Sequence, residues 1–166
     1  MSILKLTVCI IILIILDQVA KVLIYNYFMD EHFVIIPSLI EFLPVFNSKG
    51  TYLSNLFNLN IKIGIHFFHV ICQIAMFIFY ILLRKAGNNT TLFDMVFIFF
   101  EAGFICSSMG FIFLEKGCLD YTYLKPLFVF DLKDLYLNCF ICLLIIFLLK
   151  RKIRTSKDLY KLLSVK

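Results

Sequence analysis

The sequence contains little charge: only 16% of its 166 residues are Asp, Glu, Lys or Arg, and tryptophan is absent altogether. Its basic residues do not form an arginine-rich stretch with interleaved aromatics, so we expect no nucleic-acid partner. Hydrophobic residues make up 62% of the chain, more than the roughly 45–50% of a soluble domain. Such a chain needs lipid around it, and we expect one integral membrane domain over residues 1–166.

Several metal-binding and catalytic patterns are missing as well. His-Glu-x-x-His and Gly-x-Ser-x-Gly do not occur, which argues against the zinc peptidases and serine hydrolases that carry them. The six cysteines do not supply two Cys-x-x-Cys pairs, so we expect neither a zinc site nor a disulfide framework. No small-x-small cleavage pattern follows the first apolar run, which predicts a retained membrane span. We expect no metal and no cofactor.

Four apolar segments are long enough to cross a bilayer, and the fold class we expect is an all-α membrane protein. The expected spans are residues 4–26, 62–83, 93–114 and 131–149, with outer loops at 27–61 and 115–130. Basic residues follow the second and fourth spans, at Arg84-Lys85 and from Lys150 to Arg154. Short basic loops stay in the cytoplasm, so both termini are expected inside. In the first loop, Phe33–Ile36 and Ile40–Phe46 have the composition of short strands.

The unusual polar residues gather near the outer face in this arrangement, apart from Glu101 in the middle of the third span. Asp17 and Lys21 are four residues apart and share one face of the first helix. Buried together they neutralise each other, which either lets that face pack inside a bundle or leaves it free to contact a substrate. Asn47 begins a turn by composition.

The stretch from Asp120 to Asp134 lies between two membrane helices, and a carboxylate ends it on each side. Two carboxylates that lie close together cannot both ionise cheaply, so one keeps its proton. The ionised group can then draw a proton from water while the neutral group polarises a scissile carbonyl. The alternative is structural: Asp131 caps the last helix, Asp134 stabilises its first turn and Asp120 is an ordinary loop carboxylate.

Four segments, taken in chain order, are similar to the motifs of one protein family. The segment from Asp17 to Lys21 resembles Asp-Gln-x-x-Lys, and the segment from Asn47 to Gly50 resembles an Asn-x-Gly turn with one residue inserted. The segments from Cys118 to Tyr121 and from Phe130 to Asp134 are similar to Val-Val-Asp-Phe and Phe-Asn-x-Ala-Asp. These are motifs of the lipoprotein signal peptidases, the bacterial signal peptidase II group.

The resemblance implies four membrane helices with a small β-cradle from residues 29–61, in the cytoplasmic (inner) membrane of a bacterium. It implies a monomeric aspartic endopeptidase whose site faces outward and whose partners are membrane lipids and prolipoproteins. Such an enzyme removes the signal peptide from a diacylglyceryl-modified prolipoprotein by cutting before the lipidated cysteine. Asp120 and Asp134 would be the catalytic residues. The residues that would support the site or the substrate are Asp17, Lys21, Asn47 and Asp131.

The chain departs from the family pattern at three places. The motif Gly-Asn-x-x-Asp-Arg in the third helix is replaced by the segment from Cys106 to Ile112, which contains no arginine. Asp131 stands where the family has Asn, and Lys133 stands where it has Ala. Lys116, Lys125 and Lys133 are the candidates to take over the role of the missing arginine.

Two other functions are compatible with these departures. The first is a catalytically impaired relative of the same fold that binds lipidated or membrane peptides without cutting them. The second is a small structural subunit of a membrane complex, in which Glu101 and the Asp17–Lys21 pair promote helix association. Replacing Asp120 or Asp134 separates both from an enzyme.

Overall fold

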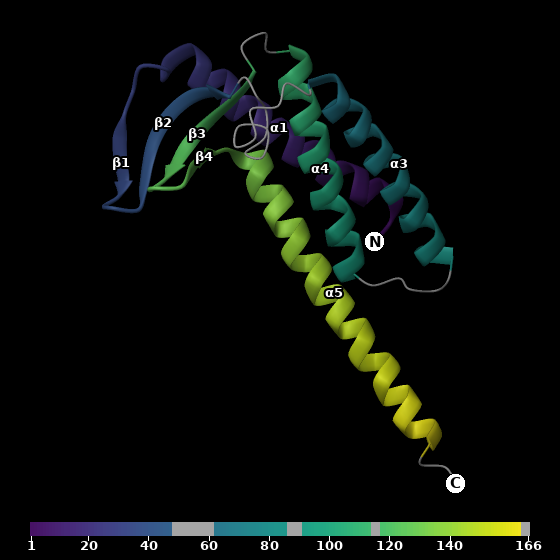
Figure 1. Ribbon diagram of the computed structural model, residues 1–166. Coiled ribbons are helices and arrows are strands. Elements are labelled where there is room, and N and C mark those ends of the chain that lie inside the picture. Colours follow the sequence, from purple (N-terminus) through teal and green to yellow (C-terminus); the bar gives the residue numbers. More distant parts are fainter. Residues whose placement is uncertain (48–61, 86–90, 114–116, 164–166) are drawn as a thin grey trace.

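The computed structural model describes residues 1–47, 62–85, 91–113 and 117–163, and side chains in 62–66, 111–113 and 151–163 are not described. Within these residues the chain forms long helices and a small antiparallel sheet (Figure 1). Four helices are long and apolar enough to cross a membrane: α1 (Ile3–Tyr27), α3 (Lys62–Lys85), α4 (Thr91–Phe113) and α5 (Leu132–Leu163). The predicted fold class is confirmed, although α5 continues beyond the expected end at residue 149.

The sheet has four strands in the order β1-β2-β3-β4. They are β1 (Phe33–Ile36), β2 (Ile40–Asn47), β3 (Cys118–Leu124) and β4 (Phe128–Phe130). The two strands predicted in the first loop are therefore present. The expectation of a cradle built from residues 29–61 alone was incomplete, because the second loop contributes β3 and β4. Its alternation of Tyr, Thr, Phe and Val favours strands and was a signal for them.

The register between β2 and β3 brings the first candidate residues together. Val45 on β2 lies opposite Asp120 on β3, and Asn47 lies opposite Cys118. Side chains two residues apart on a strand share one face of the sheet, and diagonal neighbours on paired strands lie within reach of each other. Asn47 and Asp120 are such diagonal neighbours, although 73 positions separate them in the chain.

The helix α4 forms the centre of the bundle. Inside its membrane span, 56% of residues are buried, against 17% in α1 and α5 and 11% in α3. It packs most extensively on α5, and a glycine permits this close approach: a Cβ at Gly103 would lie 2.8 Å from Leu137 Cδ2. Apolar side chains of α1, such as Ile11 and Ile15, are about half exposed and suit contact with lipid.

We expect Gly103→Val to lower stability, because its side chain has no room unless the Leu137 side chain moves or α4 and α5 separate. Overpacking of this kind costs about 1–3 kcal/mol, which circular dichroism of thermal unfolding in detergent would detect. Leu137→Ala removes the atoms that clash. The double variant should therefore lose less stability than the sum of the two single variants, and strict additivity would contradict the proposed contact.

The two ends of the bundle differ in character (Figure 1). The sheet lies at the end where α1 finishes and α5 starts, whereas the N-terminus and the last turns of α3 and α5 lie toward the opposite end. The structure thereby collects the C-terminal half of α1, the strands and the start of α5 in one place. This end of the bundle contains the candidate residues.

Candidate active site

A buried group of charged side chains lies at the sheet end of the bundle. Each of its five most buried members exposes 5% or less of its surface: Asp17, Lys21, Asp120, Asp131 and Lys133. Charges removed from water to this extent are tolerated only when they are paired. Oppositely charged partners from α1, β3 and the start of α5 supply that pairing.

Lys21 joins α1 to the start of α5. Its Nζ lies 2.7 Å from Asp17 Oδ2, one helical turn earlier, and 2.8 Å from Asp131 Oδ2. The predicted pairing of Asp17 with Lys21 is therefore present. Because Lys21 also contacts Asp131, the pair holds α1 against α5 as well as neutralising its own charges.

Lys133 forms the second bridge of the group. Its Nζ lies 2.8 Å from Asp131 Oδ1, 2.9 Å from Asp120 Oδ1 and 3.4 Å from Asp134 Oδ2. Opposite charges thus alternate from α1 through Asp131 and Lys133 to the two candidate catalytic carboxylates. Alternation of this kind limits the repulsion among buried carboxylates.

The first turn of α5 fixes the position of Asp134. The backbone N–H of Asp134 donates to Asp131 Oδ1 at 3.2 Å, and the N–H of Asp131 donates to Asp134 Oδ2 at 3.3 Å. This is a reciprocal capping box, so the structural interpretation of both residues is correct. It is also compatible with chemistry, because carboxylate oxygens of Asp120, Asp131 and Asp134 all lie within 4.8 Å of one another.

Asn47 supports Asp120 from β2. Its Nδ2 donates to Asp120 Oδ2 at 3.1 Å, while Lys133 donates to Asp120 Oδ1. Both oxygens of Asp120 are therefore held in place. The rest of the predicted turn after Asn47 lies outside the described residues.

The two candidate catalytic carboxylates occupy different environments. The Asp120 side chain is only 4% exposed, whereas that of Asp134 is 35% exposed and accessible from outside. Burial raises the pKa of Asp120 above its ordinary range, in spite of the opposing effects of Lys133 and Asn47. Burial would also raise the pKa of Asp131, but Lys133 and Lys21 outweigh it and lower that pKa. Asp131 is thus the ionised anchor of the group.

The same geometry argues against a metal site and against a cysteine nucleophile. Three carboxylates at this spacing could surround a metal ion. The ammonium group of Lys133, however, lies within 3.4 Å of all three and occupies the position that a metal ion would take. Burial raises the pKa of the Cys118 thiol to about 11. That thiol is therefore protonated at neutral pH and is a poor nucleophile.

The structure brings together all six predicted site residues. Of the three lysines predicted as replacements for the missing arginine, Lys133 is the one that contacts the candidate catalytic carboxylates. Lys116 lies outside the described residues, and Lys125 pairs with Glu41 at the far end of the β2–β3 pair. The signal for Lys133 was its place between two acidic residues at the start of a helix.

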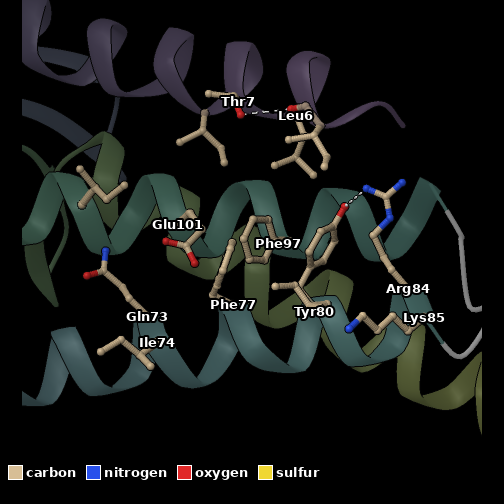
Figure 2. A pocket seen from close by; sticks show the side chains of 14 residues that line it. Leu6, Thr7, Gln73, Ile74, Phe77, Tyr80, Arg84, Lys85, Phe97 and Glu101 are labelled. Atoms are coloured by element: carbon tan, nitrogen blue, oxygen red, sulfur yellow. Dashed lines mark hydrogen bonds between the residues drawn. The ribbon is translucent and has the colours of Figure 1, made fainter.

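A large cavity lies elsewhere in the bundle, between α1, α3 and α4 (Figure 2). It measures about 900 Å³, and most of its lining side chains are apolar. Glu101 points into it from α4 beside Phe77 and Phe97, and Arg84 and Lys85 lie at one end. The cavity contains none of the predicted site residues, so the charged group remains the better candidate for chemistry.

Comparison with known proteins decides the family. A model described as signal peptidase (SPase) II matches residues 9–150 of the sequence. The chain belongs to the signal peptidase II family. The resemblance noted in the sequence is thereby confirmed, and lipoprotein signal peptidase is the function that this membership supports.

Two solved structures share the fold of this signal peptidase II family member. Both are described as a bacterial membrane enzyme determined by the in meso method, at 2.3 Å and 1.9 Å resolution. Each has a TM-score of 0.64 and 21% sequence identity to this chain. The first match covers 90% of both chains, and the second covers 89% of this chain and 94% of the other. No curated protein matches the sequence.

Proposed function

We propose that this chain is an aspartic lipoprotein signal peptidase whose catalytic residues are Asp120 and Asp134. The observation that carries the proposal is the approach of their carboxylates, with oxygens within 4.8 Å of each other. A water molecule placed between two carboxyl groups at this separation can reach both of them by hydrogen bonds.

The contacts of the two carboxyl groups favour a division of roles. Asp134 is the more exposed, and among the described residues its Oδ1 receives no hydrogen bond. Asp134 is therefore placed to accept a proton from the attacking water. Asp120 is buried, with a raised pKa, so it is suited to hold a proton and polarise the scissile carbonyl.

The hydrolytic step then balances without a cofactor. The water oxygen bonds to the carbonyl carbon and one water proton passes to Asp134. Asp120 donates a hydrogen bond to the carbonyl oxygen, which becomes negative. When the C–N bond breaks, the leaving nitrogen takes the proton from Asp134, and the dyad returns to its starting state.

We propose that the site faces the outer side of a bacterial cytoplasmic membrane, with both termini in the cytoplasm. The last turn of α3, which contains Arg84 and Lys85, and the C-terminal part of α5 lie toward the end of the bundle away from the sheet (Figure 1), as the distribution of basic loops requires. The substrate is a prolipoprotein whose cysteine carries a diacylglyceryl group. It enters sideways from the bilayer, because that lipid keeps the cysteine at the membrane surface.

The substrate class can be tested with two matched peptides. Purified protein in liposomes should cut a signal peptide that carries S-diacylglyceryl cysteine immediately before that cysteine, as mass spectrometry of both fragments would show. The same peptide with unmodified cysteine should remain uncut, because no lipid anchor holds it beside the dyad. A chelator should leave the rate unchanged.

Two outcomes would contradict this assignment. Cleavage of both peptides at equal rates would show that the enzyme does not recognise the lipid. Binding of the lipidated peptide with no cleavage at any pH would favour the non-catalytic relative that binds lipidated peptides.

A further inference from the structure

Lys133 is the most unusual residue of the site, because it places a buried cation between carboxylates that a peptidase must keep partly protonated. Its side chain is only 4% exposed. An ammonium group can donate three hydrogen bonds, and three carboxylate oxygens lie within 3.4 Å of its Nζ. With its donors engaged in this way, Lys133 acts through the carboxylates and not on the substrate.

Asp131 is the counterpart of this lysine. It contacts Lys133 through Oδ1 and Lys21 through Oδ2. If residues 131 and 133 were both uncharged, Lys21 would pair with Asp17 alone, and no cation would contact Asp120 and Asp134. The acidic and the basic residue thus enter the site together, and the total charge of the site is the same as without them.

We propose that Lys133 is a positioning residue for the Asp120–Asp134 dyad and that Asp131 is its matched counter-ion, the two together setting the proton affinity of the dyad. The inference rests on the proposed function of the dyad. It assigns to Lys133 the electrostatic role left open by the absence of an arginine in α4 from Cys106 to Gly110.

Lys133 and Asp131 have opposite effects on the pKa of Asp120. Lys133 lowers the pKa of Asp120, and Asp131 raises it, against the background of burial that raises it most. Removing the lysine should therefore let the dyad keep its proton to higher pH. Removing the negative charge of Asp131 should have the opposite result.

Titratable groups from α1, α4, β3 and the start of α5 lie around Lys133 and its counter-ion Asp131. They are Asp120, Cys118 and Tyr121 on β3, Asp131, Asp134 and Tyr136 at the start of α5, Asp17 and Lys21 on α1 beyond Asp131, and Cys106 on α4. Thiols and phenols ordinarily lose protons only above about pH 8. Between about pH 4 and 8 the charge facing the dyad therefore comes from Lys133, Asp131 and the Lys21–Asp17 pair.

The test compares pH–rate profiles of Lys133→Met, Asp131→Asn and the double variant. We expect Lys133→Met to shift both limbs of the profile upward by about one to two pH units, the size of shift that a neighbouring cation produces. Asp131→Asn keeps the helix cap and should shift the profile downward. The profile of the double variant should lie between those of the single variants, near that of the unchanged protein. The control Lys125→Met should leave the profile unshifted.

An infrared titration gives a readout independent of cleavage. The band of protonated carboxyl groups, assigned by its loss in Asp120→Asn, should titrate at higher pH in Lys133→Met and at lower pH in Asp131→Asn. A Lys133→Met variant with unshifted profile and band would overturn the inference, and so would shifts in the same direction for both single variants. Failure of the unchanged protein to cleave at any pH would instead count against the proposed function, and the infrared shifts would still decide the role of Lys133.

Discussion

Replacing either member of the dyad should abolish cleavage while leaving the fold intact. Asp120→Asn and Asp134→Asn preserve the size of the side chain but remove the carboxylate that accepts or holds the proton. Loss of a general acid or base costs about 10²- to 10⁴-fold in rate, and we expect a loss of at least about 10³-fold. The measurement is kcat with the lipidated signal peptide in liposomes.

The matched control is Asp30→Asn, which alters an exposed aspartate in the turn between α1 and β1. Its rate should equal that of the unchanged protein. Circular dichroism should show the helices of all three variants intact, because Asn retains much of the capping at the start of α5. If either dyad variant kept more than about a tenth of the activity, the aspartic mechanism would have to be abandoned.

Removing the charge of Lys21, the cation between α1 and α5, should lower stability more than Gly103→Val does. Lys21→Met leaves Asp17 and Asp131 buried without their common partner. Breaking a buried ion pair from one side costs about 3–5 kcal/mol, which corresponds to a fall of roughly 10 °C in the melting temperature of a chain of this size. Thermal unfolding followed by circular dichroism measures it.

The dependence on pH gives this prediction a second test. In the unchanged protein the pKa of Asp131 is lowered, so its stabilising contribution is present above the unfolded pKa of about 3.9 and is lost as the pH falls through the folded value. In Lys21→Met the pKa of Asp131 should rise, because one cation is gone. As the pH is lowered, Asp131 should then take up its proton earlier in the variant than in the unchanged protein, which narrows the difference in stability between them.

Lys5→Met is the control for these measurements, because Lys5 is an exposed residue on the same helix. Its melting temperature should change by no more than a degree or two. The double variant Asp17→Asn, Lys21→Met should recover part of the loss, since Asp17, the carboxylate left without a cation, is neutralised together with the lysine. No recovery, or an equal loss in Lys5→Met, would show that the Lys21 pairing does not hold the helices together.

The membrane architecture followed from composition and pattern. Long apolar runs predict helices because a lipid environment requires every backbone hydrogen bond to be made within the segment. The beginnings of all four membrane helices lie within two residues of the expected positions, because each was placed from the position and length of an apolar run. The end of α5 was missed, because its continuation from Lys150 to Leu163 is polar and carries no membrane signal.

The sheet shows where local pattern was insufficient. The strands of the first loop, Phe33–Ile36 and Ile40–Asn47, agree with the prediction. The segment from Cys118 to Leu124 lies within the predicted outer loop 115–130, but it is a strand that pairs with β2 along most of its length. Strand formation depends on a partner that is distant in the chain, and the sequence of one strand does not name that partner.

The sequence by itself determined the number of membrane helices, the grouping of polar residues at one end and the identity of six candidate residues, because each depends on hydropathy or on short motifs. Only the tertiary structure decided which charges meet. Lys21 on α1 contacts Asp131, which is 110 positions away, and Lys133 on α5 contacts Asp120 on β3. These contacts follow from the packing of α1, β3 and α5. Lys133 meets two carboxylates of its own segment, Asp131 and Asp134, and only the packing of β3 against α5 adds Asp120 as the third.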